Sequence, residues 1–241
     1  MNRVAVVTGG SRGIGRAVAL RLASDGQAVV IAYGHSPSAA DAVVAEITGK
    51  GGQAVAVQAD VADETAVAAL FDATERQFGG VDVVVNAAGV MVLSPVTELD
   101  LDDLDRMHRT NIRGTFVVDR EAARRVRRGG AIVNFSTSIT RLSAPTYAAY
   151  AASKAAVEAI SPILAKELRG RDVTVNAVAP GPTATDLFLN GKDDATIERT
   201  AKMNPMERLG TPEDIAEVVS SLAGPARWIN GQTIYVNGGV A

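Results

Sequence analysis

A tyrosine and a lysine with catalytic potential lie in the segment Tyr150-Ala151-Ala152-Ser153-Lys154. On a helix, residues four positions apart emerge on one face, so the phenol and the ammonium group meet there. The ammonium group favours the phenolate and lowers the tyrosine pKa from about 10 toward neutrality, where the phenol can exchange a proton with a substrate oxygen. Of the four tyrosines, only Tyr150 has a lysine four residues on, and the surrounding alanines predict an accessible pair. An exposed pair without chemistry is the alternative.

A second candidate site is the segment Thr8-Gly9-Gly10-Ser11-Arg12-Gly13-Ile14-Gly15, which lies between an apolar strand and a helix. A strand, a glycine turn and a helix N-terminus together form a geometry that binds pyrophosphate. The segment also fits the Gly-x-Ser-x-Gly nucleophile elbow of hydrolases, which requires an acid and then a histidine later in the chain. The last of the two histidines is His108, in a helical segment, which disfavours a hydrolase. A tight turn without a ligand is the other alternative.

Strand-like apolar runs alternate with helical segments along the chain. Several runs are apolar on both faces, as central strands of parallel sheets are. The predicted strands are 4–7, 28–32, 54–57, 81–85, 131–135, 173–178 and 233–236. The predicted helices are 14–25, 36–49, 63–78, 98–127, 147–169 and 212–223. This alternation predicts an α/β fold, a doubly wound Rossmann-type arrangement with a mostly parallel seven-stranded sheet and helices on both faces.

No linker, repeat or low-complexity tract marks a boundary, so we expect one domain over residues 1–241. The longest irregular stretch, 180–211, has a short helical piece near 193–202 and is predicted to be a substrate-binding loop. Pro162 is expected to kink the helix beyond the Tyr–Lys pair.

Composition excludes several classes of function. The net charge of −3, with acids and bases mixed, argues against nucleic-acid and membrane-surface binding. The chain has no cysteine and only two histidines, far apart in sequence, so we expect no disulfide and no metal site. The N-terminus has no signal-like apolar stretch, and a soluble cytoplasmic protein is the expectation.

Several motifs occur in one order: Thr8-Gly9-x-x-x-Gly13-Ile14-Gly15, Asn86-Ala87-Ala88-Gly89, a serine in Asn134-Phe135-Ser136-Thr137-Ser138, Tyr150-x-x-x-Lys154, and Pro180-Gly181. Together they resemble the short-chain dehydrogenase/reductase family, including its carbonyl reductases and 3-oxoacyl-carrier-protein reductases, over essentially the whole chain. The resemblance implies an oxidoreductase that transfers hydride between a nicotinamide and a carbonyl or secondary alcohol. A 3-oxoacyl thioester reductase and a non-catalytic nucleotide sensor or scaffold are the alternatives.

The resemblance also implies catalytic roles. Tyr150 would be the general acid or base, and Lys154 would lower its pKa and bind the nicotinamide ribose. Ser138 would hold the carbonyl oxygen, and Asn111 would position a water beside the lysine. Ser136 is the rival of Ser138, which is preferred because it lies twelve residues before Tyr150.

Cofactor contacts follow from the same resemblance. Asp60 and Val61 would contact the adenine, although Asp60 could instead cap a helix, and the segment 180–185 would face the nicotinamide amide. The full set of implied cofactor residues is Gly9, Ser11, Arg12, Ile14, Gly15, His35, Ser36, Asp60, Val61, Asn86, Ala87, Gly89, Tyr150, Lys154, Pro180, Gly181, Thr183 and Thr185.

NADP(H) is predicted to be preferred to NAD(H). An NAD enzyme of this architecture places an acid at the end of the second strand to bind the ribose hydroxyls. The corresponding segment, Ile31-Ala32-Tyr33-Gly34-His35-Ser36, has none, while Arg12 can reach a ribose phosphate and His35 and Ser36 can add donors. Alternatively, Arg12 lies over the adenine of either cofactor.

Two predictions concern partners. Arginines crowd the segment Arg120, Arg124, Arg125, Arg127 and Arg128, which indicates either a favourable helix C-terminus or a dock for an acidic carrier protein. The helix of Tyr150 is apolar on more than one face, and the family resemblance suggests a homotetramer. The substrate is expected to be a small-molecule carbonyl compound or alcohol, with a medium-sized apolar ketone, aldehyde or β-ketoester reduced better than a phosphorylated sugar.

Overall fold

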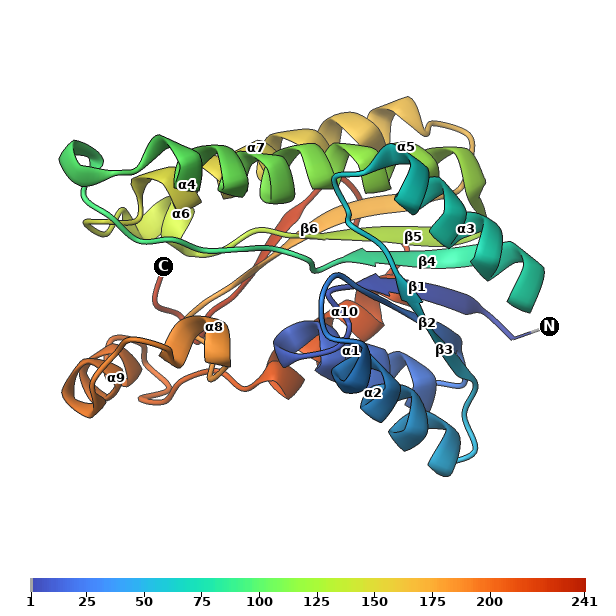
Figure 1. Cartoon of the computed structure of the whole chain (residues 1–241), viewed down its shortest axis with the longest axis horizontal. Helices are drawn as coiled ribbons and strands as arrows, with labels where there is room; N and C mark the ends of the chain where they lie inside the picture. The colour runs from blue at the N-terminus through green and yellow to red at the C-terminus, as the bar shows by residue number, and fades with distance from the viewer. Residues whose placement is uncertain (1) are drawn as a thin grey trace.

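Seven parallel strands form one sheet in the order β3-β2-β1-β4-β5-β6-β7 (Figure 1). The computed structural model describes residues 2–241. The strands are β1 (Val4–Thr8), β2 (Ala28–Tyr33), β3 (Ala54–Gln58), β4 (Val81–Asn86), β5 (Val126–Phe135), β6 (Thr174–Pro180) and β7 (Thr233–Val236). Every neighbouring pair is parallel, so the prediction of a doubly wound α/β fold is confirmed.

Helices cover both faces of the sheet. The helical elements are α1 (Gly13–Ser24), α2 (Pro37–Gly49), α3 (Glu64–Phe78), η1 (Val96–Glu98), α4 (Leu101–Met107), η2 (His108–Arg113), α5 (Gly114–Arg125), α6 (Ile139–Leu142), α7 (Ala148–Glu167), α8 (Asp186–Leu189), α9 (Asp194–Ala201) and α10 (Pro212–Ala223). In Figure 1, α1, α2 and α10 lie on one side of the sheet and α3, α5 and α7 on the other.

Two separate apolar cores hold these layers together. Along β1, Ala5 and Val7 belong to the core beneath α1, α2 and α10, whereas Val6 belongs to the core beneath α3, α5 and α7. Successive side chains of a strand point to opposite faces, so a strand that is apolar throughout feeds both cores. Each fully buried aliphatic side chain stabilises the fold by about 1.5–3 kcal/mol.

The strand order reverses between β1 and β4, and this reversal positions the site. In doubly wound sheets the crevice at such a point opens beyond the carboxyl ends of the strands. Thr8, which ends β1, donates from Oγ1 to Asn86 Oδ1 at 3.0 Å and accepts from the Ala88 backbone N–H at 3.1 Å. These bonds fix the glycine turn after β1 beside the turn after β4.

Some predicted boundaries were wrong. Strand β5 begins at Val126, so Arg127 and Arg128 lie in a strand and not at the end of a helix. The extension is stabilised by Arg127, whose Nε donates to Asp82 of neighbouring β4 at 2.9 Å. The single helix predicted over 98–127 consists of η1, α4, η2 and α5, with η2 a turn of π-helix.

The stretch 180–211 is more ordered than predicted. It contains α9 as expected and also the short α8, and Thr183 pairs with Gly210 in an isolated parallel bridge. Both helices lie beyond the edge where the strands end (Figure 1). Helix α7 continues through Pro162 to Glu167. Among residues 2–241, no helix combines the length and the apolar character needed to span a bilayer.

A buried polar cluster joins α5, β5 and α7 in the second core. Asn134 Nδ2 donates to Asp119 Oδ2 at 2.8 Å and to Ser161 Oγ at 3.1 Å. The other oxygens, Asp119 Oδ1 and Asn134 Oδ1, have no donor among the described residues. Burial raises the pKa of Asp119 from its ordinary 3.8 to about 7, although the bond from Asn134 opposes the shift. Protonation of Asp119 avoids the cost of a buried carboxylate charge that has no basic partner.

We predict that Asp119→Asn flattens the dependence of thermal stability on pH. From about pH 4 to about pH 7 the folded wild type binds a proton that the unfolded chain has lost, so its unfolding free energy falls as pH rises and levels off above that window. Asparagine keeps a neutral donor at every pH. Melting temperatures from about pH 5 to about pH 8 should therefore diverge in favour of the variant as pH rises. The exposed Asp105→Asn serves as control, and parallel curves for Asp119→Asn and wild type would refute the assignment.

Candidate active site

Helix α7 brings Tyr150 and Lys154 together in a buried position. Lys154 Nζ lies 6.0 Å from the centre of the Tyr150 ring and donates to the Phe135 carbonyl oxygen, at the end of β5, at 2.8 Å. The exposed fractions are 9% for Tyr150 and 5% for Lys154. The prediction of an accessible pair was therefore wrong, because the neighbouring segments cover what the small alanines leave open.

The protonation of this pair also differs from the sequence-based expectation. Burial, with a smaller contribution from the neighbouring Tyr147, raises the pKa of Tyr150 instead of lowering it. Burial lowers the pKa of Lys154 from 10.5 to about 8. Desolvation penalises the charged form of each group and shifts the two pKa values in opposite directions. Tyr150 is thus held as a neutral phenol, while most Lys154 side chains remain charged at neutral pH.

Asn111 holds the segment after β4 against α7. It lies in η2, and its side chain bonds both backbone groups of Val90, accepting from the N–H at 2.9 Å and donating to the oxygen at 2.9 Å. Its Nδ2 also donates to Ser153 Oγ at 3.0 Å, and Ser153 in turn donates to the Tyr150 carbonyl oxygen at 2.7 Å. π-Helical turns often occur at functional sites. Sequence reasoning assigned Ser153 no role, although it lies between the two motif residues.

The two candidate serines occupy different environments. Ser138 is buried, and its Oγ donates to the Ala179 carbonyl oxygen of β6 at 3.2 Å. Ser136 Oγ instead donates to a carboxylate oxygen of Glu158 at 2.7 Å. Ile139, next to Ser138, packs against the apolar cluster that contains Tyr150. Ser138 therefore lies in the segment that borders Tyr150, whereas the hydroxyl of Ser136 is engaged elsewhere.

The turn after β1 fits a bound pyrophosphate. Helix α1 begins at Gly13 with no acid in its first turn, and its N-cap residue Arg12 makes no side-chain capping bond. The helix N–H groups therefore remain available for an anion. A Cβ on Gly15 would lie 2.2 Å from the Gly9 carbonyl oxygen, so only glycine allows this tight approach of turn and helix.

Gly89 approaches the buried ammonium group closely. A Cβ on Gly89 would lie 3.4 Å from Lys154 Nζ and 3.3 Å from Asn111 Oδ1. A larger residue would therefore press against both side chains, whereas glycine leaves them clear. On the other side of the crevice, a Cβ on Gly13 would lie 3.5 Å from Thr185 Cγ2. The segment after β6 therefore meets the glycine turn, as expected for residues that share one dinucleotide.

The remaining predicted residues lie on the same edge of the sheet. Thr183 is buried and donates from Oγ1 to the Gly181 carbonyl oxygen at 2.9 Å, whereas Thr185 is the N-cap residue of α8. Val61 is buried beneath Gly114 at the start of α5. The turns and strand ends after β1, β4 and β6 carry Ser11, Ile14, Asn86, Ala87, Pro180 and Gly181.

Donors gather at the end of β2. Ser36 is the N-cap residue of α2 but makes no side-chain capping bond, and α2 has no acid in its first turn. His35 and Arg12 are exposed, and space around a Cβ on Gly34 is open. The Gly10 N–H donates to the Ala32 carbonyl oxygen at 3.3 Å, so the glycine turn adjoins this corner. The arrangement fits an additional phosphate group.

Asp60 does not cap α3, because Asp63 is the N-cap residue and accepts from the Thr65 and Ala66 N–H groups. Asp60 Oδ1 accepts from the Ala62 N–H at 2.9 Å. Its other oxygen forms an ion pair with Arg109 of η2 at 2.8 Å. No sequence signal indicated Arg109, since the pairing depends on how η2 packs beside β3.

The arginine-rich segment does not form an isolated basic surface. Its arginines pair with neighbouring acids: Arg120 with Glu64, Arg124 with Glu121, Arg125 with Asp72, Glu75 and Glu121, and Arg127 with Asp82. Arg128 Nη1 donates to the Gly170 carbonyl oxygen at 2.9 Å. The charge that suggested an acidic carrier protein is thus largely balanced within the chain.

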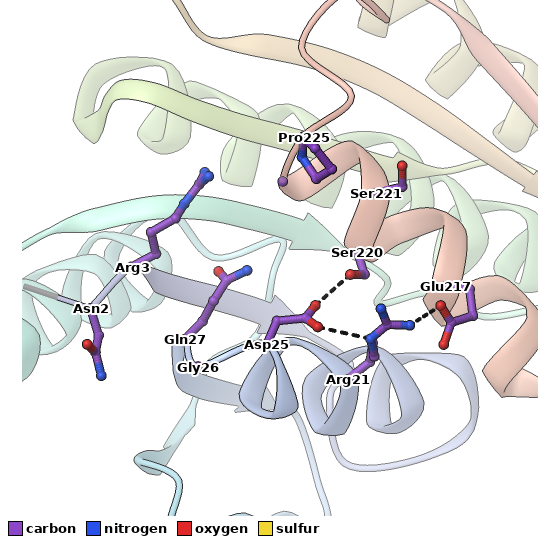
Figure 2. Close-up of a pocket in the computed structure, with 11 residues that line it drawn as sticks. Asn2, Arg3, Arg21, Asp25, Gly26, Gln27, Glu217, Ser220, Ser221 and Pro225 are labelled. Atoms are coloured by element: carbon purple, nitrogen blue, oxygen red, sulfur yellow. Dashed lines mark hydrogen bonds and ion pairs between the residues drawn. The ribbon is translucent and has the colours of Figure 1, made fainter.

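A hollow at the opposite edge of the sheet lies where the strands begin (Figure 2). Asp25, after α1, accepts from Ser220 Oγ of α10 at 2.5 Å, and Arg21 pairs with both Asp25 and Glu217. These polar groups join α1 to α10, far from the residues that form the candidate active site.

Comparisons with known proteins identify the family. A family model described as enoyl-(acyl carrier protein) reductase matches residues 9–241. A short-chain type dehydrogenase/reductase of Picea abies is 47% identical over 248 residues, which cover 98% of this chain and 92% of that protein. The chain belongs to the short-chain dehydrogenase/reductase family. It is an NAD(P)-dependent enzyme of that family, and the prediction of an oxidoreductase is confirmed.

The descriptions of two further relatives mention NADP or NADPH. NADPH-dependent aldehyde reductase 2, chloroplastic, of Arabidopsis thaliana is 44% identical over 98% of this chain and 93% of its own length. A short-chain dehydrogenase of Burkholderia cenocepacia, solved in complex with NADP, has a TM-score of 0.93 and 39% identity over 99% of this chain and 97% of its own. The family's fold therefore extends over nearly the whole chain.

Proposed function

We propose that this enzyme reduces apolar aldehydes or ketones with NADPH, with Tyr150 as the general acid. The buried Tyr150–Lys154 pair, with Gly89 close to the ammonium group, is the observation that carries the proposal. A bound nicotinamide cofactor would supply the hydride to the carbonyl carbon. The residues of the chain supply position, a proton and electrostatic stabilisation.

Each polar residue has a distinct role in this reaction. Tyr150, kept protonated by burial, donates its phenolic proton to the carbonyl oxygen as negative charge develops there. Ser138 turns its hydroxyl from Ala179 to the same oxygen and stabilises that charge. Lys154 stabilises the resulting phenolate and binds the ribose, while Asn111 keeps the segment at Val90 in place beside it. In the reverse direction, the phenolate is the base.

The proposed substrate is a medium-sized apolar aldehyde, ketone or β-ketoester. The residues packed around Tyr150 are largely apolar: Val90, Met91, Val92, Leu99, Leu104, Met107, Ile139, Tyr147 and Ala149. Such a lining favours apolar ligands over phosphorylated sugars because polar groups lose hydration on entering it. The stretch 180–211 would close over the substrate, with Leu187 and Met203 as exposed apolar residues available to contact it.

NADP(H) is the proposed cofactor, in preference to NAD(H). The corner formed by Arg12, His35 and Ser36 offers donors, and the acid near His35, Asp60, is itself paired with Arg109. The names of the Arabidopsis and Burkholderia relatives agree with this choice.

We also propose that a second copy of the chain covers the groove between α5 and α7. The groove has an apolar floor that includes Ile112, Phe116 and Ile160, and the exposed fractions of Phe116 and Ile163 are 55% and 57%. Charges of both signs line it: Glu64, Arg113, Arg120, Arg124, Glu167 and Arg171. An apolar surface with both signs of charge suits a two-fold contact, in which one patch meets its own copy. A homotetramer requires a second such contact.

Tyr150→Phe tests the chemistry. Loss of the phenolic proton should lower kcat at least about 100-fold, as for one missing general acid, with little change in cofactor affinity. Lys154→Ala should reduce both turnover and cofactor binding. NADPH oxidation with a panel of apolar aldehydes, ketones and phosphorylated sugars measures turnover, and cofactor fluorescence measures binding. Turnover close to wild type in Tyr150→Phe would disprove the assignment.

Arg12→Ala tests the cofactor preference. One charge-assisted bond to phosphate contributes about 1.5–3 kcal/mol, so wild type should prefer NADPH by roughly 10- to 100-fold in kcat/KM. The variant should lose most of this ratio through a higher KM for NADPH, while kcat/KM for NADH stays nearly constant. Equal wild-type values for the two cofactors, or an unchanged ratio in the variant, would contradict the proposal.

Ile163→Asp tests the assembly. A carboxylate in the middle of the apolar groove should weaken self-association, because it would be buried without a partner. Light scattering at micromolar concentration should show an oligomer for wild type and a smaller species for the variant. Val96→Asp, at an exposed apolar residue outside the groove, is the matched control. A wild-type mass of only 24.9 kDa would rule out this contact.

A further inference from the structure

The carboxylate of Glu158 is a hydrogen-bond acceptor for hydroxyl groups from three elements near the candidate active site. It lies on α7, one turn beyond Lys154. Its Oε1 accepts from Ser136 Oγ, just after β5, at 2.7 Å. Thr140 Oγ1, in α6, lies 2.9 Å from Glu158 Oε1 and 2.9 Å from the Thr137 carbonyl oxygen, so these two acceptors share its single proton. The phenol of Tyr235, in β7, lies 3.3 Å from both carboxylate oxygens. Glu158 has no basic partner among residues 2–241 that the structure describes, so these hydroxyl groups are what hold it.

Two of these hydroxyl groups belong to Ser136 and Thr140, which lie two residues before and two residues after Ser138 in the sequence. Ser138 is itself bonded to β6, since its N–H donates to the Pro180 carbonyl oxygen at 2.8 Å and its Oγ to Ala179 at 3.2 Å. Those bonds fix it relative to the sheet but not relative to the helix that carries Tyr150. The bonds from Ser136 and Thr140 to Glu158 make that second connection.

The third hydroxyl group, that of Tyr235 in β7, connects α7 to the turn at residues 237–239 that follows this strand. In that turn, a Cβ on Gly238 would lie 2.8 Å from Asn204 Oδ1. The turn therefore packs against the end of the proposed substrate-binding loop. The guanidinium group of Arg141 lies 3.9 Å from the centre of the Tyr235 ring, which further restrains the phenol.

We propose that Glu158 is a positioning residue that holds Ser138 at the correct distance from Tyr150. An ionised carboxylate only accepts hydrogen bonds, so it can bind several hydroxyl donors at once, and its bonds are stronger than those of a neutral acceptor. Displacement of catalytic groups by about 1 Å can cost about 100-fold in rate. The inference rests on the proposed function, because it assigns Glu158 a part in the same reaction.

Glu158→Ala and Glu158→Gln form the test. Glu158→Ala should lower kcat by about 10- to 100-fold, with the dissociation constant of NADPH unchanged within about twofold. Glutamine keeps one oxygen for the two hydroxyl groups and offers an N–H to Tyr235, so Glu158→Gln should recover most of the rate. Ser161→Ala is the matched control, since it removes another hydrogen bond between α7 and β5, at Asn134. It should lower the melting temperature without lowering kcat.

A double-mutant cycle separates positioning from general destabilisation. If Glu158 acts through Ser138, Glu158→Ala should reduce kcat little further in a Ser138→Ala background. If Glu158→Ala lowered kcat by the same factor with and without Ser138→Ala, the two residues would act independently and the proposal would be overturned. A wild-type kcat in Glu158→Ala would also overturn it. If Tyr150→Phe is inactive while Glu158→Ala is fully active, the positioning role of Glu158 is refuted and the proposed function stands.

Hydrogen exchange gives a readout that does not depend on turnover. The amides of Thr140 and Arg141, which bond within the turn around Ser138, should exchange faster in Glu158→Ala than in wild type or Ser161→Ala, because segment 136–140 would be released from α7. Unchanged exchange at these two amides would overturn the positioning role even if no tested carbonyl compound were reduced, an outcome that would count separately against the proposed function.

Discussion

A polar contact between α7 and the end of β5 determines the geometry of the candidate active site. Lys154 and Glu158 lie one turn apart on α7 and bond to the backbone of Phe135 and the side chain of Ser136. The carboxyl ends of parallel strands meet at one edge of the sheet, so this contact connects the helix that carries Tyr150 to the strand ends that would surround a cofactor. The glycine turn, the segment after β4 and the loop after β6 are arranged around it.

Exclusion of water at this contact sets the charges of the site. Burial disfavours the charged forms of Tyr150, Lys154 and Asp119 alike, raising the pKa of the two acids and lowering that of the lysine. A dry site strengthens each remaining electrostatic interaction. The neutral phenol suits proton donation to a carbonyl oxygen, and the charged lysine suits stabilisation of the phenolate that follows. Glu158 accepts hydrogen bonds from the hydroxyl groups around it and so restrains the segment that carries Ser138.

Sequence periodicity was sufficient to predict the fold, and motif order was sufficient to predict the family. Every predicted strand formed, because runs apolar on both faces require helices on both sides of a parallel sheet. The sequence could not show the burial of Tyr150, which depends on segments distant along the chain. It also could not show the start of β5 at Val126, which depends on the pairing of Arg127 with Asp82 in β4. Glu158 had a weak signal, since it lies four residues after Lys154 on the same helix, but its three hydroxyl partners come together only in the folded structure.

The most direct test of the account is to follow the hydride. Wild-type enzyme would be incubated with an apolar aldehyde or ketone and NADPH that carries deuterium at C4 of the nicotinamide, on one face at a time. The account predicts that deuterium from one face only appears on the carbinol carbon of the alcohol product, in proportion to the NADPH consumed. Oxidation of NADPH that puts no label in the alcohol from either face, or no alcohol from any carbonyl compound tested, would contradict it.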